Sequence, residues 1–393
     1  MKVFHRLKNT HTIKNRNISS KQLVLAGLFL FFTFSLAIIV PPKITETTSS
    51  NKLSQKSSVV ETGLKSKGDD WGIEWHQTYG YSPNEKGYWV EQTSDGGYII
   101  MGYRYDPLGD QNGWLIKVDA NGEKEWTSGF GSPFGDDVGY CVKETSDGGY
   151  IVTGYRTDGD SFTGYIVNAM LSKRSSNGYS LWSKSFGGSE DDMGYSVDQT
   201  SDGGYILVGA TKSFGSGGYD FLIVKTDENG NEEGAYTYGT TKDEVARCVK
   251  KTSDGGYVIA GYYSSIFNYE FLLLKIDSNF NFLWVKDWGG ASDDRAYCVD
   301  ETDDGGYVLV GKTESFGAGS SDVWLIKTDA YGNELWNNTF GGTGYDMGYS
   351  VDQTSDGGYI ITGYTNSYGA GEYDVWLIKT DVNGTEEWSK TFG

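Results

Sequence analysis

The sequence predicts an all-β protein, a β-propeller of six four-stranded repeats, and two observations carry the prediction. First, an Asp-Gly-Gly-Tyr tetrapeptide recurs six times, and its tyrosines are Tyr98, Tyr150, Tyr205, Tyr257, Tyr307 and Tyr359. Successive tyrosines are 52, 55, 52, 50 and 52 residues apart, a period typical of propellers, solenoids and arrays. Second, each unit contains strand patterns separated by turn residues, and no unit shows a helical apolar period. A β-solenoid is the structural alternative, although its coils are usually shorter.

The last unit shows the four strands most clearly. Residues 349–354 alternate apolar and polar side chains, and residues 359–365 are rich in β-branched and aromatic side chains. Residues 374–380 are nearly continuous in apolar side chains, as expected of a strand buried on both faces. Residues 386–392 form the fourth strand after an Asp-Val-Asn-Gly turn. Four antiparallel strands in about 50 residues correspond to one propeller blade.

Closure of the ring has two solutions. Residues 71–80 match a fourth strand, so one extra strand precedes six complete repeats, which span about 85–135, 136–190, 191–242, 243–292, 293–344 and 345–393. We expect six repeats to form the ring with the extra strand packed outside it, because repeats usually correspond one to one with blades. The alternative is an incomplete seven-bladed ring.

Strands three and four of the units resemble the tryptophan-docking repeats of the quinoprotein-like (PQQ-like) β-propellers. The shared pattern is an aliphatic strand, an Asp-x-Asn-Gly turn and then a tryptophan, at Trp126, Trp182, Trp284, Trp336 and Trp388. The resemblance implies that each tryptophan packs between neighbouring blades. Gly234 stands at the tryptophan position of the third unit, where a weaker dock is therefore expected. Units with this SDGGY sequence are also similar to repeats of secreted archaeal and bacterial surface proteins.

The N-terminal part predicts export. Residues 1–21 carry six basic residues and no acid, which is typical of a cytoplasmic tail. Within residues 22–41, the run Leu23–Val40 is almost wholly apolar and is long enough to span a bilayer, which takes about 17–25 residues. We expect a transmembrane signal-anchor; a signal peptide cleaved near Ala37 is the alternative. Residues 42–68 are rich in Ser and Thr and predict a disordered linker. The propeller, residues 69–393, is then extracellular on a single-pass anchor, or secreted.

The net charge limits the binding partners that are expected, and the cysteine positions bear on whether a disulfide is expected. The chain has a net charge of −20, and without the six basic residues of the tail it has 27 Lys and Arg against 53 Asp and Glu. A body this acidic repels nucleic acid, so no nucleic-acid partner is expected. Cys141, Cys248 and Cys298 share one position in strand one. We expect buried thiols without a disulfide, because residues at the same position of different blades are not expected within bonding range.

A carboxylate precedes strand one in every unit and is the main candidate site. The six residues are Glu85, Asp137, Asp192, Glu244, Asp294 and Asp346. If strand one lines the central channel, these residues form a ring at one mouth that would bind a ligand or a hard cation such as Ca²⁺. The alternative is that each carboxylate accepts turn N–H groups within its own blade, and no cofactor is then expected. The lysines of strand three, such as Lys117 and Lys379, are expected to pair with the Asp two residues later.

Catalytic signals are scarce. Among the exported residues the only histidine is His76, so neither a histidine metal cluster nor a Ser-His-Asp set can be assembled. The second-to-third loops differ between units, and variable loops on a rigid scaffold commonly carry binding. We therefore expect a non-enzymatic binding scaffold for an unknown protein or carbohydrate ligand. A carbohydrate-active hydrolase using the channel-mouth carboxylates and a structural or adhesion protein of the cell surface are the alternatives.

Overall fold

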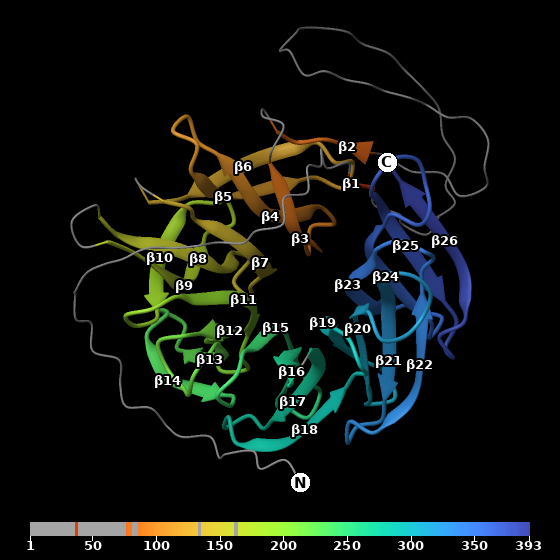
Figure 1. Ribbon diagram of the computed structural model, residues 1–393. Coiled ribbons are helices and arrows are strands. Elements are labelled where there is room, and N and C mark those ends of the chain that lie inside the picture. Colours follow the sequence, from red (N-terminus) through yellow and green to blue (C-terminus); the bar gives the residue numbers. More distant parts are fainter. Residues whose placement is uncertain (1–35, 38–75, 81–84, 133–134, 161–163, 267) are drawn as a thin grey trace, which may run out of the picture.

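The fold is a six-bladed β-propeller. The computed structural model describes residues 36–37, 76–80, 85–132, 135–160, 164–266 and 268–393, and the described part contains no helix. Six four-stranded antiparallel sheets stand around a common axis, with the first strand of each sheet innermost (Figure 1). The predicted all-β class and the six four-stranded repeats are therefore confirmed.

The blades follow the repeats in order along the chain. Blade one contains β3 Lys86–Gln92, β4 Tyr98–Tyr105, β5 Gln111–Val118 and β6 Lys124–Phe130. Blade two contains β7 Val138–Glu144, β8 Tyr150–Asp160, β9 Gly164–Arg174 and β10 Ser180–Phe186. Blade three contains β11 Asp192–Gln199, β12 Tyr205–Thr211, β13 Asp220–Thr226 and β14 Glu232–Tyr238.

The other three blades have the same order of strands. Blade four contains β15 Glu244–Lys251, β16 Tyr257–Ser264, β17 Tyr269–Ile276 and β18 Phe282–Trp288. Blade five contains β19 Asp294–Glu301, β20 Tyr307–Thr313, β21 Asp322–Thr328 and β22 Glu334–Phe340. Blade six contains β23 Asp346–Gln353, β24 Tyr359–Thr365, β25 Asp374–Thr380 and β26 Glu386–Phe392.

The hydrophobic core lies between the blades. One apolar cluster joins Phe271 of blade four, Val310 of blade five and Val351 of blade six, all at most 1% exposed. Polar bonds also cross four of the junctions, where the backbone N–H beside the turn Asp donates to a side chain at the end of the next blade's first strand. These bonds are Ser94 to Glu144 at 2.6 Å, Ser146 to Gln199 at 2.9 Å, Ser253 to Glu301 at 2.7 Å and Asp303 to Gln353 at 2.7 Å. Each blade therefore needs its neighbour to complete its core.

The face of blade six that points away from blade five is more open than its counterparts. Ile360, Val375 and Leu377 are half-buried on this face and Thr362 is exposed. Their counterparts Val308, Val323, Leu325 and Val310 in blade five are at most 1% exposed, because blade six covers them. Among the described residues, none of the cross-blade bonds joins blade six to blade one. The incomplete seven-bladed ring thus stays a prediction beside the six observed blades.

A two-stranded sheet lies between blades six and one (Figure 1). Leu36–Ala37 form β1, which pairs with β2, His76–Gln77. Tyr79, in the predicted extra strand 71–80, packs on the apolar cluster of blade one that includes Tyr98, and its hydroxyl donates to Gly122 O at 2.6 Å. No helix in the described chain has the length and apolar character needed to cross a bilayer. The predicted membrane segment and linker fall outside the described residues, apart from 36–37, and stay predictions.

Candidate functional site

The predicted carboxylates hold loops together. Asp137, Asp192, Glu244, Asp294 and Asp346 are at most 2% exposed, and Glu85 is half-buried. Each buried one accepts from nearby turns; Asp294, for example, accepts from Ser315 Oγ at 2.7 Å and from the Gly290 N–H at 2.8 Å. Within the described residues, no three His, Cys, Asp or Glu side chains are placed to share a metal ion. This geometry matches the alternative in which each carboxylate accepts hydrogen bonds from nearby turns. Binding of a ligand or cation by the six carboxylates stays a prediction.

Two of these carboxylates face a second acid across a blade junction. A Cβ on Gly239 would lie 1.9 Å from Asp220 Oδ1 and 2.8 Å from Glu244 Oε2, and one on Gly341 would lie similarly between Asp322 and Asp346. Burial, with the neighbouring acids adding to it, raises the pKa of Glu244 to about 7 and those of Asp220 and Asp322 to about 6. These acids are buried in the joints between blades.

Four of the five predicted tryptophans lie between blades. Their rings contact a tyrosine of the next blade and cover the glycine of its strand three-to-four turn. The pairs are Trp126 with Tyr150, Trp182 with Tyr205, Trp284 with Tyr307 and Trp336 with Tyr359, at centroid distances of 5.7, 5.8, 5.9 and 5.7 Å. A Cβ on Gly384 would lie 2.4 Å from the Trp336 ring, and its φ is +75°, so only glycine fits. Trp388 pairs with Lys379 in the β25–β26 ladder.

The junction between blades three and four is filled differently. Gly234 occupies the tryptophan position, and Phe280 stands where the other turns have glycine, with φ 64°. Phe280 is 4% exposed and stacks on Tyr236, with centroids 5.5 Å apart and an angle of 15° between the rings. The phenylalanine of blade four therefore takes the space that a tryptophan of blade three would fill. The sequence predicted a weaker dock at this place, and the structure shows a substitute.

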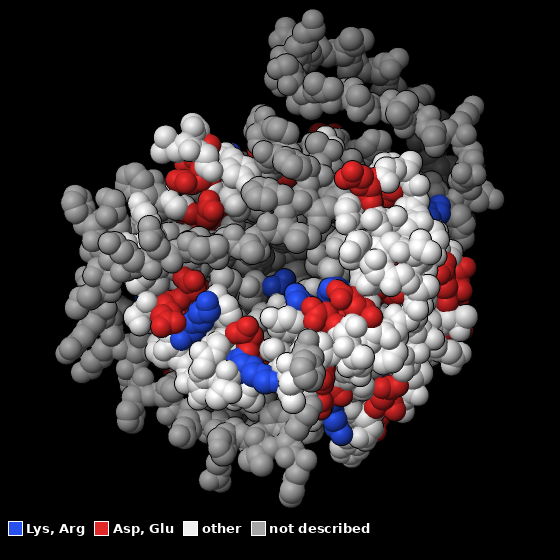
Figure 2. Space-filling model, viewed as in Figure 1, with Lys and Arg blue, Asp and Glu red and all other residues white. Residues whose placement is uncertain are grey.

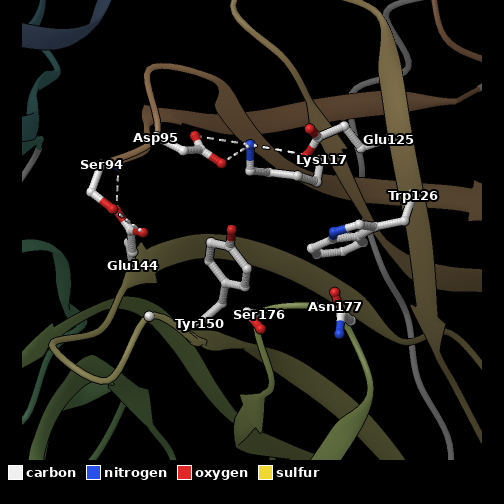
Figure 3. A pocket seen from close by; sticks show the side chains of 10 residues that line it. Ser94, Asp95, Lys117, Glu125, Trp126, Glu144, Tyr150, Ser176 and Asn177 are labelled. Atoms are coloured by element: carbon white, nitrogen blue, oxygen red, sulfur yellow. Dashed lines mark hydrogen bonds and ion pairs between the residues drawn. The ribbon is translucent and has the colours of Figure 1, made fainter.

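A groove of about 510 Å³ opens beside the dock of blades one and two (Figure 3). Lys117 in this groove is 2% exposed and binds Asp95 at 2.9 Å and Glu125 at 3.3 Å. Equivalent lysines bind the Asp of the Asp-Gly-Gly-Tyr turn in every other blade, at Asp147, Asp202, Asp254, Asp304 and Asp356. The expectation that these lysines pair with the Asp two residues later is wrong, because strand three directs them toward the neighbouring hairpin turn. Since its parts recur at other junctions, we regard the groove as a structural joint.

A bulge at one position of strand one builds a different feature. In every blade the register of strands one and two shifts by one residue there, which leaves that residue without a ladder partner. The six bulged residues are Tyr88, Tyr140, Tyr195, Arg247, Tyr297 and Tyr349. Because strand one is innermost, these side chains belong to the wall of the channel. We call them the channel belt.

Neighbouring members of the channel belt touch. Tyr88 and Tyr140 have centroids 5.1 Å apart, Tyr140 and Tyr195 5.0 Å, and Tyr297 and Tyr349 5.2 Å. The Arg247 guanidinium lies 4.0 Å from the Tyr195 ring centroid and 5.6 Å from that of Tyr297. In Figure 2, Lys and Arg atoms lie along one side of the hollow at the centre of the face, with Asp and Glu atoms beside them. The belt thus presents aromatic faces and one cation to the axis.

Protonation in the channel belt is fixed at neutral pH. Burial raises the pKa values of Tyr88 and Tyr195 to about 12, and it also raises those of Tyr140, Tyr297 and Tyr349. Burial alone would lower the pKa of Arg247, but the tyrosines Tyr195, Tyr262 and Tyr297 outweigh it and the pKa is raised. The phenols are therefore neutral donors and the guanidinium stays charged.

A second ring of charged residues follows three positions further along strand one. Its members are Glu91, Lys143, Asp198, Lys250, Asp300 and Asp352. Both lysines are paired within it, Lys143 with Glu91 and Lys250 with Asp300, each at 2.6 Å. Burial and the nearby Asp300 raise the pKa of Asp352. Four acids against two lysines make this level of the channel negative.

The three thiols are buried and free. Cys248 Sγ lies 3.8 Å from Cys298 Sγ, closer than the sequence led us to expect. First strands converge toward the axis, so residues at one repeat position of adjacent blades approach each other.

Comparisons with known proteins give no more than a distant structural likeness. No protein-family model matches the chain, and no curated protein is similar to it. Among solved structures, a protein of unknown function from Dyadobacter fermentans is 10% identical over 78% of this chain and 94% of its own, with a TM-score of 0.47. Sqt1 from Chaetomium thermophilum is 11% identical over 78% and 71%, with a TM-score of 0.43. An α-L-arabinofuranosidase from Clostridium thermocellum is 8% identical over 63% and 91%, with a TM-score of 0.35. Likeness this distant carries no information on ligand or activity.

Proposed function

We propose that this protein is an extracellular, membrane-anchored binding scaffold whose ligand occupies the central channel. The channel belt is the observation that carries the proposal. Five tyrosines and one arginine occupy a position that the ladder does not use, and they converge on one axis. Tyrosines offer flat apolar faces together with hydroxyl groups, a combination suited to carbohydrate or protein ligands. The basic tail followed by a long apolar run supports the extracellular placement.

A further binding surface lies at the mouth of the channel where the first strands begin. The second-to-third loops surround this mouth, and Phe316 and Tyr368 in them are 46% and 48% exposed. Each also contacts a tryptophan of its own blade, Trp324 at 5.1 Å and Trp376 at 5.4 Å. These rings are held in place by the scaffold while one face stays open to solvent. Such loops would extend the contact of a ligand beyond the channel.

The proposal is tested with neutral oligosaccharides on the full chain. Saturation-transfer NMR with cello- and malto-oligosaccharides should show transfer to the probe, because sugar rings stack on tyrosine faces. The double variant Tyr140→Ala/Tyr297→Ala should lose at least tenfold in affinity, and Tyr179→Ala should not. Tyr179 is the matched control, because it is 75% exposed on an outer turn. Equal losses in the two variants would contradict a channel site.

A further inference from the structure

Arg247 is the one departure from tyrosine in the channel belt. Five of the six blades carry tyrosine at the bulge, and blade four carries arginine. The bulge is the same in all six blades, since the register shift between Ala246 and Cys248 matches those elsewhere. The backbone therefore does not require arginine at this position. A change that the scaffold does not need points to the ligand.

The charge of Arg247 has no carboxylate partner among the described residues. Four other basic groups on the first or second strands do have one: Lys143 with Glu91, Lys250 with Asp300, Arg295 with Asp293 and Lys312 with Glu314. The described groups that face Arg247 are aromatic, chiefly Tyr195 and Tyr297. Acids are abundant in a chain with 53 of them, so the missing partner does not reflect scarcity.

Aromatic faces alone do not balance this cation. A cation–π contact contributes about 0.5–2 kcal/mol, whereas charge-assisted hydrogen bonds to a carboxylate are roughly twice as strong as neutral ones, and the half-buried Arg247 makes none with a described residue. The guanidinium fork suits a carboxylate in particular, because it can donate two parallel hydrogen bonds. A bound carboxylate would therefore supply what the free channel lacks at Arg247.

The rest of the channel limits how much charge a ligand can carry. The ring of Glu91, Asp198, Asp300 and Asp352 with two lysines lies three residues further along strand one, about 10 Å away at 3.3 Å per residue. This negative level, in a chain of net charge −20, repels a polyanion. One carboxylate at the level of Arg247 is compatible with it.

Resting on the function proposed above, we propose that the channel recognises a saccharide bearing a single carboxylate, with Arg247 binding the carboxylate and the belt tyrosines stacking on the sugar ring. The sugar is a uronic acid or a similar acidic unit. Arg247 is thus a specificity-determining residue, and the tyrosines bind acidic and neutral sugars alike.

The experiment compares matched sugars on the full chain by titration calorimetry or ligand-observed NMR. D-Glucuronate should bind about tenfold or more tighter than D-glucose, which has the same ring without the carboxylate. Arg247→Tyr installs the residue of the other five blades, so the melting temperature should not change while the preference for glucuronate is lost. Arg247→Lys should retain part of the preference, because it keeps the charge without the fork.

Moving the arginine gives the sharpest control. Tyr140 in blade two has Lys143 three residues later, as Arg247 has Lys250. The double variant Arg247→Tyr/Tyr140→Arg should therefore restore the preference for glucuronate. A wild-type protein that binds glucose and glucuronate equally would overturn the anion inference while leaving the binding scaffold in place. Binding of neither sugar, with the neutral oligosaccharides also silent, would overturn the scaffold itself. Acetate or an acidic peptide binding as tightly as glucuronate would refute a saccharide ligand.

Discussion

Blades five and six share an identical third strand and bury it differently. β21 and β25 both read DVWLIKT. All residues of β21 are buried, whereas Val375 and Leu377 of β25 are half-buried. The difference arises from the neighbour, since blade six covers β21 and no described blade covers β25 in the same way. Burial in this fold therefore belongs to the junction and cannot be assigned to a strand from its own residues.

The largest expected effect tests the difference in burial between β21 and β25 directly. Leu325→Ala should lower the free energy of unfolding by about 3 kcal/mol, because it opens a cavity in a closed junction. Leu377→Ala, the same change at the same position of an identical strand, should cost about 1 kcal/mol, because Leu377 is half-buried. Urea unfolding of the two variants measures the difference. Equal losses would mean that blade six is covered on both faces in solution.

The junction of blades three and four gives a second comparison, between a dock filled by Phe280 and the docks filled by tryptophan. Gly234→Trp should destabilise the protein by about 2 kcal/mol, because Phe280 already occupies the space and cores resist overpacking. Adding Phe280→Gly should recover most of that loss by recreating the dock seen at Trp284 and Gly332. Denaturant unfolding of the single and double variants gives the coupling. Additive losses would show that Phe280 does not replace the missing tryptophan.

The smallest expected effect is on the pH dependence of stability, and it concerns Asp322 and Asp374, the first residues of the two identical strands. Burial and the nearby Asp346 raise the pKa of Asp322 to about 6. The folded state then holds a proton that the unfolded state releases near pH 4, so stability should fall as pH rises from about 4 to about 6. Asp322→Asn should flatten this fall by about 1 kcal/mol, measured as melting temperature against pH. Asp374→Asn controls for the loss of a strand-end acid, and an equal flattening by both would contradict the assignment to the joint.

Much of the scaffold was predictable from the sequence because each blade repeats the same local signals. The fixed spacing of the tyrosines and the strand patterns of residues 359–365, 374–380 and 386–392 match β24, β25 and β26. Turn bonding by the strand-one carboxylates was predicted as one of two alternatives, since an Asp before a strand commonly accepts turn N–H groups. These features depend on residues close together in the chain.

Features that depend on how blades meet were not predictable. The approach of Cys248 to Cys298 follows from convergence at the axis, and the pairing of Lys117 with Asp95 follows from the direction of strand three. The channel belt was missed because a bulge interrupts the alternation on which strand assignments rely. A signal was nevertheless present, since the residue before the Cys, Ser or Trp of strand one is tyrosine in five units and arginine in one.

The bulge of strand one has an evolutionary consequence. Its residue sits outside the ladder, so drift at that place leaves the pairing on either side intact. Six positions far apart in the sequence thus form one ring around the channel axis, occupied here by five tyrosines and Arg247. Single substitutions at these positions can therefore change the ligand specificity of the channel while the strand pairing, and with it the fold, is preserved.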